Sequence, residues 1–440
     1  MGTYMEIRRT ILKDLSVWKE SKHRKPLVLQ GARQVGKSWA LNRFGREHFD
    51  KCAYINFDAM PEIKHDFART KDPKRLIGIL STVSGVKIEP GNTLIIFDEI
   101  QECNDALNSL KYFCEQAPEY AIVCAGSLLG VALNRQGASF PVGKVDIMRM
   151  YPVSFSEYLS AVSPRLVEIL YSITAPEPVP EAIHSNLIDA YKTYLALGGM
   201  PEAVSIYADT ADWQQADTVL NNILQAYSLD FSKHIATKDI PRVFAVWGNI
   251  EGHLARDNRK FRFAEIQKGA RAREYENAIE WLCLAGLTHR VSCVNTPRLP
   301  LAAYKNSSSF KLYLSDVGLL RSKFHLDPST ILLGDKLLTE FKGVLSENYV
   351  LTSLIRQFGD EQFYWSSGNT AEIEFILQYK GNIIPVEVKS GNNVAAKSLS
   401  EYRKKYLPEI AIRLSTKNLR KDDGLINVPL YLADRLKEFL

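Results

Sequence analysis

The sequence predicts an α/β fold of several domains, with a parallel sheet in its N-terminal part. Three observations lead to this prediction. Residues 26–41 read as a buried strand, a glycine loop and a helix in succession. Residues 92–101 contain a second apolar strand, which ends in two adjacent acids. Helical segments alternate with these apolar runs, as in chains whose parallel strands are joined by crossover helices.

The glycine loop is residues 31–38, GARQVGKS, and follows the pattern G-x-x-x-x-G-K-[ST] between strand and helix. Its glycines let the backbone bend so that N–H groups point inward at a phosphate chain, and the helix start adds a partial positive charge. We therefore predict ATP and Mg2+ as cofactors, with Lys37 on the β- and γ-phosphates and Ser38 on the metal. The alternative is a loop that only joins strand to helix. The predicted nucleotide-binding residues are Gly31, Ala32, Arg33, Gln34, Val35, Gly36, Lys37, Ser38 and Trp39.

Three further residues complete the predicted chemistry. Asp98 and Glu99 end the strand in NTLIIFDEIQ, where open α/β sheets place their functional groups. We expect Asp98 to help hold Mg2+, and Glu99 to orient and deprotonate water. Two solvated acids at a strand end are the alternative. The next apolar strand, residues 120–125, precedes Ser127, which is either a sensor of the γ-phosphate or a simple turn residue. Lys37, Glu99 and Ser127 are the predicted catalytic residues.

The composition is that of an ordinary globular protein, with 46% hydrophobic and 24% charged residues over 440 positions. A net charge of +5 restricts any nucleic-acid surface to a local patch. Six scattered cysteines without a C-x-x-C pair indicate neither a zinc site nor a disulfide framework. The first residues lack the apolar core of a signal peptide, and the most apolar run is shorter than the roughly 18 residues of a membrane span. We expect a cytoplasmic protein without membrane association.

The middle of the chain reads as helices at 155–235, interrupted by a proline-rich stretch, and then as a winged helix at 240–320. The wing strands are predicted at 287–291 and 310–314. Between Arg256 and Arg273 lysines and arginines outnumber acids, and we predict that these basic residues contact DNA phosphates. A solvated basic face or a subunit contact is the alternative. The predicted contacts are Arg256, Arg259, Lys260, Arg262, Lys268, Arg271 and Arg273.

A hairpin is predicted in the C-terminal part of the chain, around the turn Lys380-Gly381. A symmetric turn at this position places Glu374 opposite Glu387, and Glu372 opposite Lys389. Like charges directly opposite one another are destabilising unless a cation or a proton relieves them. The hairpin therefore predicts either a divalent metal bound between the two glutamates or their neutralisation by Lys389 and nearby hydrogen bonds.

Glu347, on a helix that begins near residue 338, joins Glu374 and the pair Glu387-x-Lys389 in a pattern that resembles the PD-(D/E)xK nuclease core. In that resemblance the carboxylates hold Mg2+ and the lysine positions or activates water. The departure is Glu374, where aspartate is commoner, because the longer side chain moves the metal. A nuclease-like fold kept as a binding or assembly module is the alternative.

Stretches along nearly the whole chain resemble the AAA+-type P-loop ATPase family with a C-terminal DUF4143 region. The resemblance implies an ATPase core at 1–150, a helical lid at 151–238, a winged-helix domain at 239–325 and an α/β restriction-endonuclease-like domain at 326–440. It also implies a homo-oligomer, such as a ring, with ATP between subunits. The stretches that carry it are GARQVGKS, LIIFDEIQ, AGS, YPVSFSEYL (151–159), YLALGGMPEAV (194–204), SENYVLTSL (346–354) and AEIEFIL...VEVKSG (371–391).

The family often carries Gly-Arg before its Pro-x-Ser-Phe motif, whereas this chain has Gly143-Lys144. If that arginine serves a neighbouring subunit's ATP, Lys144 would do so less well, because it lacks the planar fork of arginine. Arg135 and Arg149 are alternative arginine fingers, and Arg33 is a candidate within the same subunit. The sequence does not choose among them.

These observations predict Mg-dependent ATP hydrolysis coupled to DNA binding or remodelling in an oligomer. One alternative is a metal-dependent DNA nuclease whose access to DNA is gated by the ATPase. Another is a protein-remodelling or toxin–antitoxin-like regulator that binds no nucleic acid. Salt-dependent binding to duplex DNA separates the last alternative from the other two.

Overall fold

The computed structural model describes residues 7–127, 140–256, 258–332, 339–368, 371–391 and 397–440. The chain folds into two compact units. One comprises Arg9–Tyr151 with Leu284–Gly286, and the other consists mainly of Pro152–Cys283 and Leu287–Leu440. Among the helices described, none combines the length and the apolar character that crossing a membrane requires.

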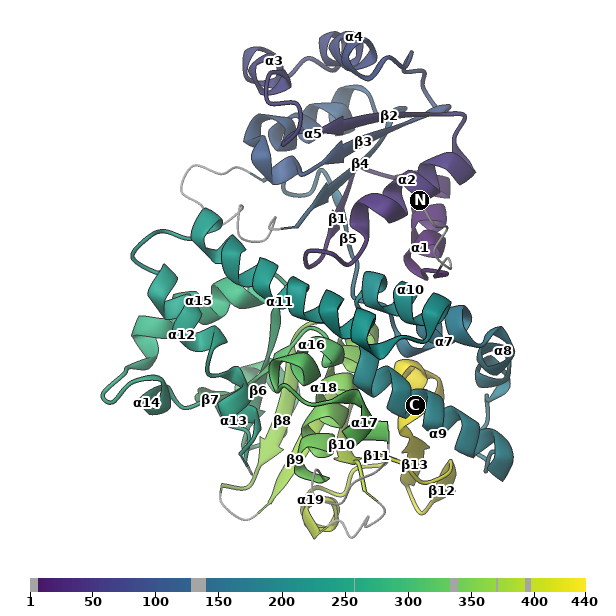
Figure 1. Ribbon diagram of the computed structural model, residues 1–440, viewed down its shortest axis with the longest axis vertical. Helices are drawn as coiled ribbons and strands as arrows, with labels where there is room; N and C mark the ends of the chain where they lie inside the picture. Colours follow the sequence, from purple (N-terminus) through teal and green to yellow (C-terminus); the bar gives the residue numbers. More distant parts are fainter. Residues whose placement is uncertain (1–6, 128–139, 257, 333–338, 369–370, 392–396) are drawn as a thin grey trace. The chain divides into compact units, whose positions relative to one another are not determined.

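The first unit contains a five-stranded parallel sheet in the order β2-β3-β4-β1-β5 (Figure 1). Every strand pair in it is parallel, so all five strands end at the same edge. The strands are β1 (Leu27–Gln30), β2 (Lys51–Asn56), β3 (Thr93–Asp98), β4 (Ala121–Gly126) and β5 (Asp146–Arg149), and the helical segments are α1 (Ile11–Glu20), α2 (Lys37–His48), α3 (Ile63–Arg69), α4 (Pro73–Ser84), the 3-10 helix η1 (Ile100–Glu102) and α5 (Asn104–Gln116).

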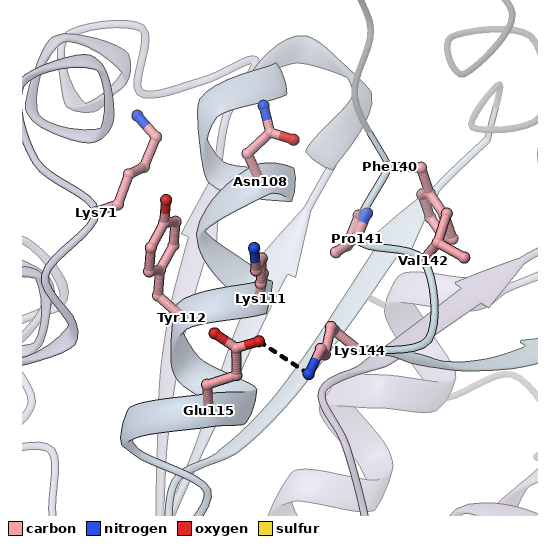
Figure 2. Close-up of a pocket in the computed structure, with 9 residues that line it drawn as sticks. All are labelled: Lys71, Asn108, Lys111, Tyr112, Glu115, Phe140, Pro141, Val142 and Lys144. Atoms are coloured by element: carbon pink, nitrogen blue, oxygen red, sulfur yellow. Dashed lines mark ion pairs between the residues drawn. The ribbon is translucent and has the colours of Figure 1, made fainter.

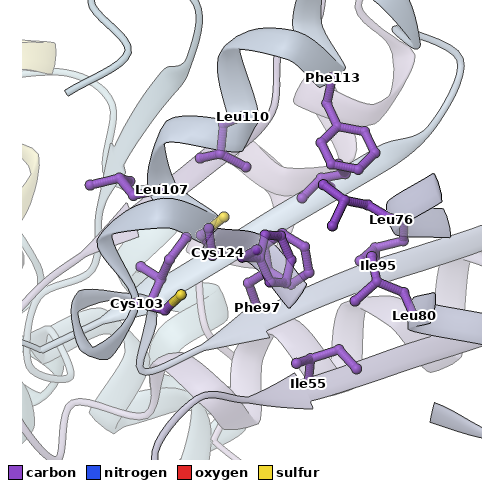
Figure 3. Close-up of a cluster of buried hydrophobic side chains, with 14 of the residues drawn as sticks. Ile55, Leu76, Leu80, Ile95, Phe97, Cys103, Leu107, Leu110, Phe113 and Cys124 are labelled. Carbon is purple, nitrogen blue, oxygen red and sulfur yellow. The ribbon is translucent and has the colours of Figure 1, made fainter. Parts of the chain in front are cut away.

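Two hydrophobic clusters cover the two faces of this sheet. Ile95 and Phe97 of β3 pack with side chains of α4 and α5 (Figure 3) and also of α3. Leu94 and Ile96 pack with side chains of α1 and α2. Successive residues of a strand point to opposite faces, so a strand buried on both faces is apolar at every position. The run Leu94–Phe97 is apolar throughout for this reason, and it ends at Asp98.

The second unit contains an eight-stranded mixed sheet in the order β12-β13-β11-β10-β9-β8-β6-β7 (Figure 1). Pairs β6–β8, β10–β11 and β11–β13 are parallel, and the others are antiparallel. The strands are β6 (Thr288–Val294), β7 (Lys305–Leu314), β8 (Gln362–Ser366), β9 (Glu372–Tyr379), β10 (Asn382–Lys389), β11 (Ala411–Ser415), β12 (Arg420–Asp422) and β13 (Leu425–Pro429).

The helices of this unit precede the sheet, lie between its strands or, in the case of η4 (Leu430–Phe439), follow the last strand. They are α7 (Phe155–Val162), α8 (Pro164–Ser172), α9 (Glu181–Leu197), α10 (Pro201–Thr210), α11 (Trp213–His234), α12 (Ile240–Trp247), α13 (Ile250–Leu254), α14 (Phe263–Ile266), α15 (Ala272–Leu284), η2 (Leu301–Tyr304), α16 (Val317–Lys323), α17 (Pro328–Leu332), α18 (Thr339–Phe358), α19 (Lys397–Tyr406) and η4 (Leu430–Phe439).

The hairpin β9–β10 has the register that its turn predicts, with Leu377 paired to Ile384 and Phe375 paired to Val386. The two strands predicted as a separate wing differ from expectation. They are the antiparallel pair β6–β7, and β6 also pairs in parallel with β8. The two predicted wing strands are therefore the last two strands at one side of the eight-stranded sheet. This sheet contains strands from both sides of the domain boundary predicted at 325/326. The last five residues of β7 are buried, which suits a strand inside a larger core better than an exposed wing.

Candidate functional site

The loop between β1 and α2 is shaped by its glycines and by one close contact. Gly31 has a φ of 155° and Gly36 a φ of 93°, both of which are strained for residues with a Cβ atom. A Cβ on Gly31 would lie 2.2 Å from the carbonyl oxygen of Met150, so only glycine fits there. Ser38 lies in the first turn of α2, immediately after Lys37. The first unit therefore forms a tight loop that opens onto a helix N-terminus.

The amino group of Lys37 is buried inside this loop. It donates hydrogen bonds to the carbonyl oxygens of Gly31, at 2.9 Å, and Ala32, at 2.7 Å. Burial lowers the pKa of Lys37 to about 8, although the carboxylates of Glu99 and Asp98 act in the opposite direction. A buried ammonium whose hydrogen-bond acceptors are carbonyls, and no carboxylate, is well suited to an anionic ligand. The loop therefore fits a phosphate group.

Asp98 is the last residue of β3 and is only 4% exposed. One carboxylate oxygen accepts the Tyr54 hydroxyl at 2.5 Å, and the other accepts the backbone N–H of Glu99 at 3.0 Å. Burial, together with this bond to Asp98, raises the pKa of Tyr54 to about 12, so Tyr54 stays a donor at neutral pH. Each oxygen of Asp98 keeps a lone pair that can face a cation. Together with the Ser38 hydroxyl, this is a donor set of the kind that Mg2+ prefers.

Glu99 adopts a left-handed backbone conformation, with a φ of 49°. Such a conformation is uncommon for a residue other than glycine and is concentrated at functional positions. The side-chain amide of Gln101 donates to a carboxylate oxygen of Glu99 at 2.5 Å. Ser127 directly follows β4, which lies between β1 and β3, and its hydroxyl accepts from the Arg33 side chain at 3.3 Å. The strand ends thus bring the predicted loop, acid and sensor residues to one edge.

Sequence motifs did not identify three residues at this site, which are Arg9, Tyr54 and Gln101. Arg9 donates to the carbonyl oxygen of Val35 in the loop, whereas Tyr54 and Gln101 bond to the two acids. Only Tyr54 has a signal in the sequence, because alternation along β2 places its side chain on the face opposite Ala53 and Ile55. Trp39, which we predicted to bind nucleotide, is 41% exposed.

The candidate arginine fingers occupy different places. Lys144 forms an ion pair with Glu115 at 2.8 Å, in a pocket of about 540 Å3 that Lys71 and Lys111 also line (Figure 2). Arg149 is exposed at the carboxyl end of β5, next to Gln30 in register. Arg33 bonds to Ser127 within the same unit, and Arg135 lies outside the described residues. A role for any of them toward another subunit stays a prediction.

The acidic hairpin of the second unit is neutralised by basic side chains. Lys389 lies 3.7 Å from a carboxylate oxygen of Glu374 and 3.4 Å from one of Glu387. Arg413 on β11 lies 3.3 Å from the other oxygen of Glu387. Burial raises the pKa of Glu387, against the attraction of Lys389 and Arg413. The sequence leaves open whether a metal, or Lys389 with nearby hydrogen bonds, relieves the repulsion. The described contacts show Lys389 beside both acids and add Arg413.

Glu347, the third predicted acid, is also paired. It forms an ion pair with Arg259 and accepts the Tyr313 hydroxyl at 2.9 Å. Within the described part of the chain, no group of three or more His, Cys, Asp or Glu side chains is arranged to hold a metal ion. Glu347, Glu374 and Glu387 thus belong to a network of ion pairs in this structure.

The seven cations predicted to contact DNA divide into two groups. Arg256 pairs with Glu265, Arg259 with Glu347, and Lys260 lies 3.9 Å from Glu372. The side chains of the second group are exposed around α14 and at the start of α15. This second group is Arg262, Lys268, Arg271 and Arg273.

The first unit defines the class of protein, because a phosphate loop after β1, acids after β3 and an intervening β4 on one parallel sheet are typical of P-loop ATPases. Family models then show that the chain contains an AAA domain and a C-terminal DUF4143 domain. The AAA domain matches residues 23–159, and the domain of unknown function DUF4143 matches 342–433. A further domain of unknown function, DUF8612, matches 188–330 and crosses the boundary predicted at 238/239. The comparison with curated proteins found no match.

Solved structures with similarity include the Aeropyrum pernix ORC2 protein, at 10% identity and a TM-score of 0.36, over 79% of this chain and 95% of that one. The Thermotoga maritima RuvB Holliday junction branch migration motor has 16% identity and a TM-score of 0.30, over 66% and 90%. C. elegans PCH-2 has 11% identity and a TM-score of 0.28, over 46% of this chain and 62% of that one. At these TM-scores the superpositions carry no argument about function, so the class rests on the sheet and the matched domains.

The lowered pKa of Lys37 predicts that nucleotide binding takes up a proton at mildly alkaline pH. Above a pKa of about 8 the free amine is largely neutral, and a bound polyphosphate favours its charged form. Titration calorimetry of Mg-ADP near pH 9, in buffers of different ionisation heat, should show uptake that fades toward pH 7. The Lys37→Arg variant stays charged over this range and should show none. Equal heats in all buffers for the parent protein would contradict the prediction.

The ion pairs of the hairpin predict that Glu387 is not a metal ligand. In the Lys37→Ala background, which removes the phosphate-loop lysine, Mn2+ should shift the melting temperature equally with and without Glu387→Gln. The exposed Glu401→Gln serves as the control. Melting is measured on the full chain, because β6 and β8 join the predicted domains in one sheet. A Mn2+ shift that follows mass action and disappears only in Glu387→Gln would show a metal site.

Proposed function

We propose that the first unit binds ATP with Mg2+ and hydrolyses it. One observation carries this proposal. Lys37, which is buried and hydrogen-bonded to two backbone carbonyls, lies at the same edge of the parallel sheet as Asp98 and Glu99. Attraction from both Glu99 and Asp98 on the Lys37 ammonium supports their proximity. Ser127 follows β4, the strand between β1 and β3, and supplies a hydroxyl at the same edge of the sheet.

Each residue has a separate task in this proposal. Lys37 and the inward N–H groups of the loop bind the phosphates, and Ser38 with Asp98 would hold the Mg2+. When bound, the metal neutralises charge on the phosphate oxygens. Glu99 orients the attacking water and accepts its proton, while the Gln101 amide holds the carboxylate in place. The Ser127 hydroxyl, which accepts a hydrogen bond from Arg33, would report on the terminal phosphate.

The proposal extends to DNA, which the basic residues around α14 and α15 predict, and to an oligomer, which the family resemblance implies. The exposed cations Arg262, Lys268, Arg271 and Arg273 support a DNA contact around α14 and α15, because they are accessible to phosphates. Arg256, Arg259 and Lys260 support it less, since carboxylates of the same unit lie beside them. In the proposed oligomer, Lys144 or Arg149 would complete a neighbour's site.

The proposal predicts that Lys37→Ala and Glu99→Gln fail in different ways. Lys37→Ala should lose nucleotide binding, because it removes the cation that faces the phosphates. Glu99→Gln should keep binding but lower ATP turnover by about a hundredfold or more, because it removes the group that takes the proton from water. Phosphate release and nucleotide affinity are the two measurements, with the exposed Glu62→Gln as control. Turnover at the parent rate in Glu99→Gln would assign water activation to another residue.

The exposed cations predict that Arg271→Gln with Arg273→Gln weakens binding to duplex DNA and flattens its salt dependence. Each lost phosphate contact reduces the slope of log K against log salt by about 0.9, so the double variant should lose about 1.8. Fluorescence anisotropy over a salt series measures both effects, and ATPase activity without DNA should be retained. Arg165→Gln, an exposed arginine on α8, is the control. An unchanged slope would assign these arginines to a subunit contact or a solvated surface.

A further inference from the structure

Arg9 lies just before α1, outside the matched AAA domain, which begins at residue 23. Its side chain is nevertheless buried, with 7% of the residue exposed. One terminal nitrogen of the guanidinium donates to the carbonyl oxygen of Val35 at 2.9 Å, and the other donates to the carbonyl oxygen of Tyr151 at 2.6 Å. Arg9 therefore joins the phosphate loop to the chain that leaves β5.

The bond to Val35 determines how one peptide unit of the loop is turned. A trans peptide is planar, so its carbonyl and its N–H point in opposite directions. When Arg9 holds the Val35 carbonyl, the N–H of Gly36 must point away from Arg9. Gly36 has a φ of 93° and no Cβ atom, so little within the loop itself prevents this peptide from turning over. The external bond from Arg9 selects one of the two orientations.

The bond to Tyr151 gives the guanidinium a fixed position. Tyr151 follows Met150, whose N–H donates to Gln30 at 2.8 Å and whose carbonyl lies against Gly31. The segment Met150–Tyr151 therefore packs against the start of the loop, while Arg9 reaches from it to the end of the loop. Arginine suits this position because its planar fork presents two donors to two carbonyls at once, whereas lysine presents a single point charge.

We propose that Arg9 is a positioning residue of the nucleotide site, which presents the Gly36 N–H to the phosphates of the bound nucleotide. The inference rests on the proposed nucleotide binding by this loop. Arg9 touches two backbone carbonyls, and it acts through the peptide between Val35 and Gly36. In its absence the loop keeps all its residue types but loses the constraint on one inward N–H group.

The test compares binding of Mg-ADP to the full-length parent, Arg9→Ala and Arg9→Lys by titration calorimetry. A charge-assisted hydrogen bond is worth enough that its loss should raise the Kd about tenfold or more. Arg9→Lys should fall between the parent and Arg9→Ala, because it makes one of the two bonds. Arg8→Ala, the exposed neighbouring arginine, is the matched control and should bind as the parent does.

Guanidinium ion provides a readout that a general loss of stability would not give. At millimolar concentrations, well below those that denature proteins, it should restore Mg-ADP affinity in Arg9→Ala by refilling the site, and methylammonium should not. A Kd for Arg9→Ala equal to that of the parent, or a weakened Kd with no guanidinium rescue, would overturn the role of Arg9. A parent protein that binds no nucleotide would instead overturn the proposed function. If Arg9→Ala does not fold, the intermediate Kd of Arg9→Lys decides the matter.

Discussion

Parallel pairing of β3, β4 and β1 is the constraint on which the site depends. Parallel strands run in the same direction, so the residues that follow them meet at one edge. The loop after β1, Asp98 at the end of β3 and Ser127 after β4 come together only for this reason. Helices connect these strands as crossovers. Each crossover returns the chain to the end of the sheet where the previous strand began, so the next strand runs in the same direction. A reversed β3 would place its acids at the far end of the sheet.

The two units balance their buried charges differently. In the second unit, Glu347 pairs with Arg259, and Glu387 pairs with Lys389 and Arg413. A buried ion pair compensates much of the cost of removing both charges from water. In the first unit, Lys37 bonds to two carbonyls, and burial depresses its pKa. One unit therefore satisfies its acids internally, whereas the other gains from an external anion.

The phosphate loop also shows how much a short motif leaves to its surroundings. Its pattern requires glycine at positions 31 and 36. Gly31 is required by the close contact with Met150, and Gly36 by its left-handed backbone conformation. The orientation of the peptide units is a separate matter. It depends on bonds from residues that are distant in sequence, because a glycine-rich segment has several conformations of similar free energy.

The sequence by itself determined the features that depend on neighbouring residues: the phosphate loop, the apolar strand before Asp98, and the register of the hairpin at Lys380-Gly381. These follow from local periodicity and turn geometry, which act over a few residues. Only the tertiary structure decided that β6 joins β8, that Arg413 pairs with Glu387, and that Arg9 reaches Val35. Such contacts join segments far apart in the chain, and their free energy comes from burial and charge compensation in the assembled fold, which no local pattern of residues records.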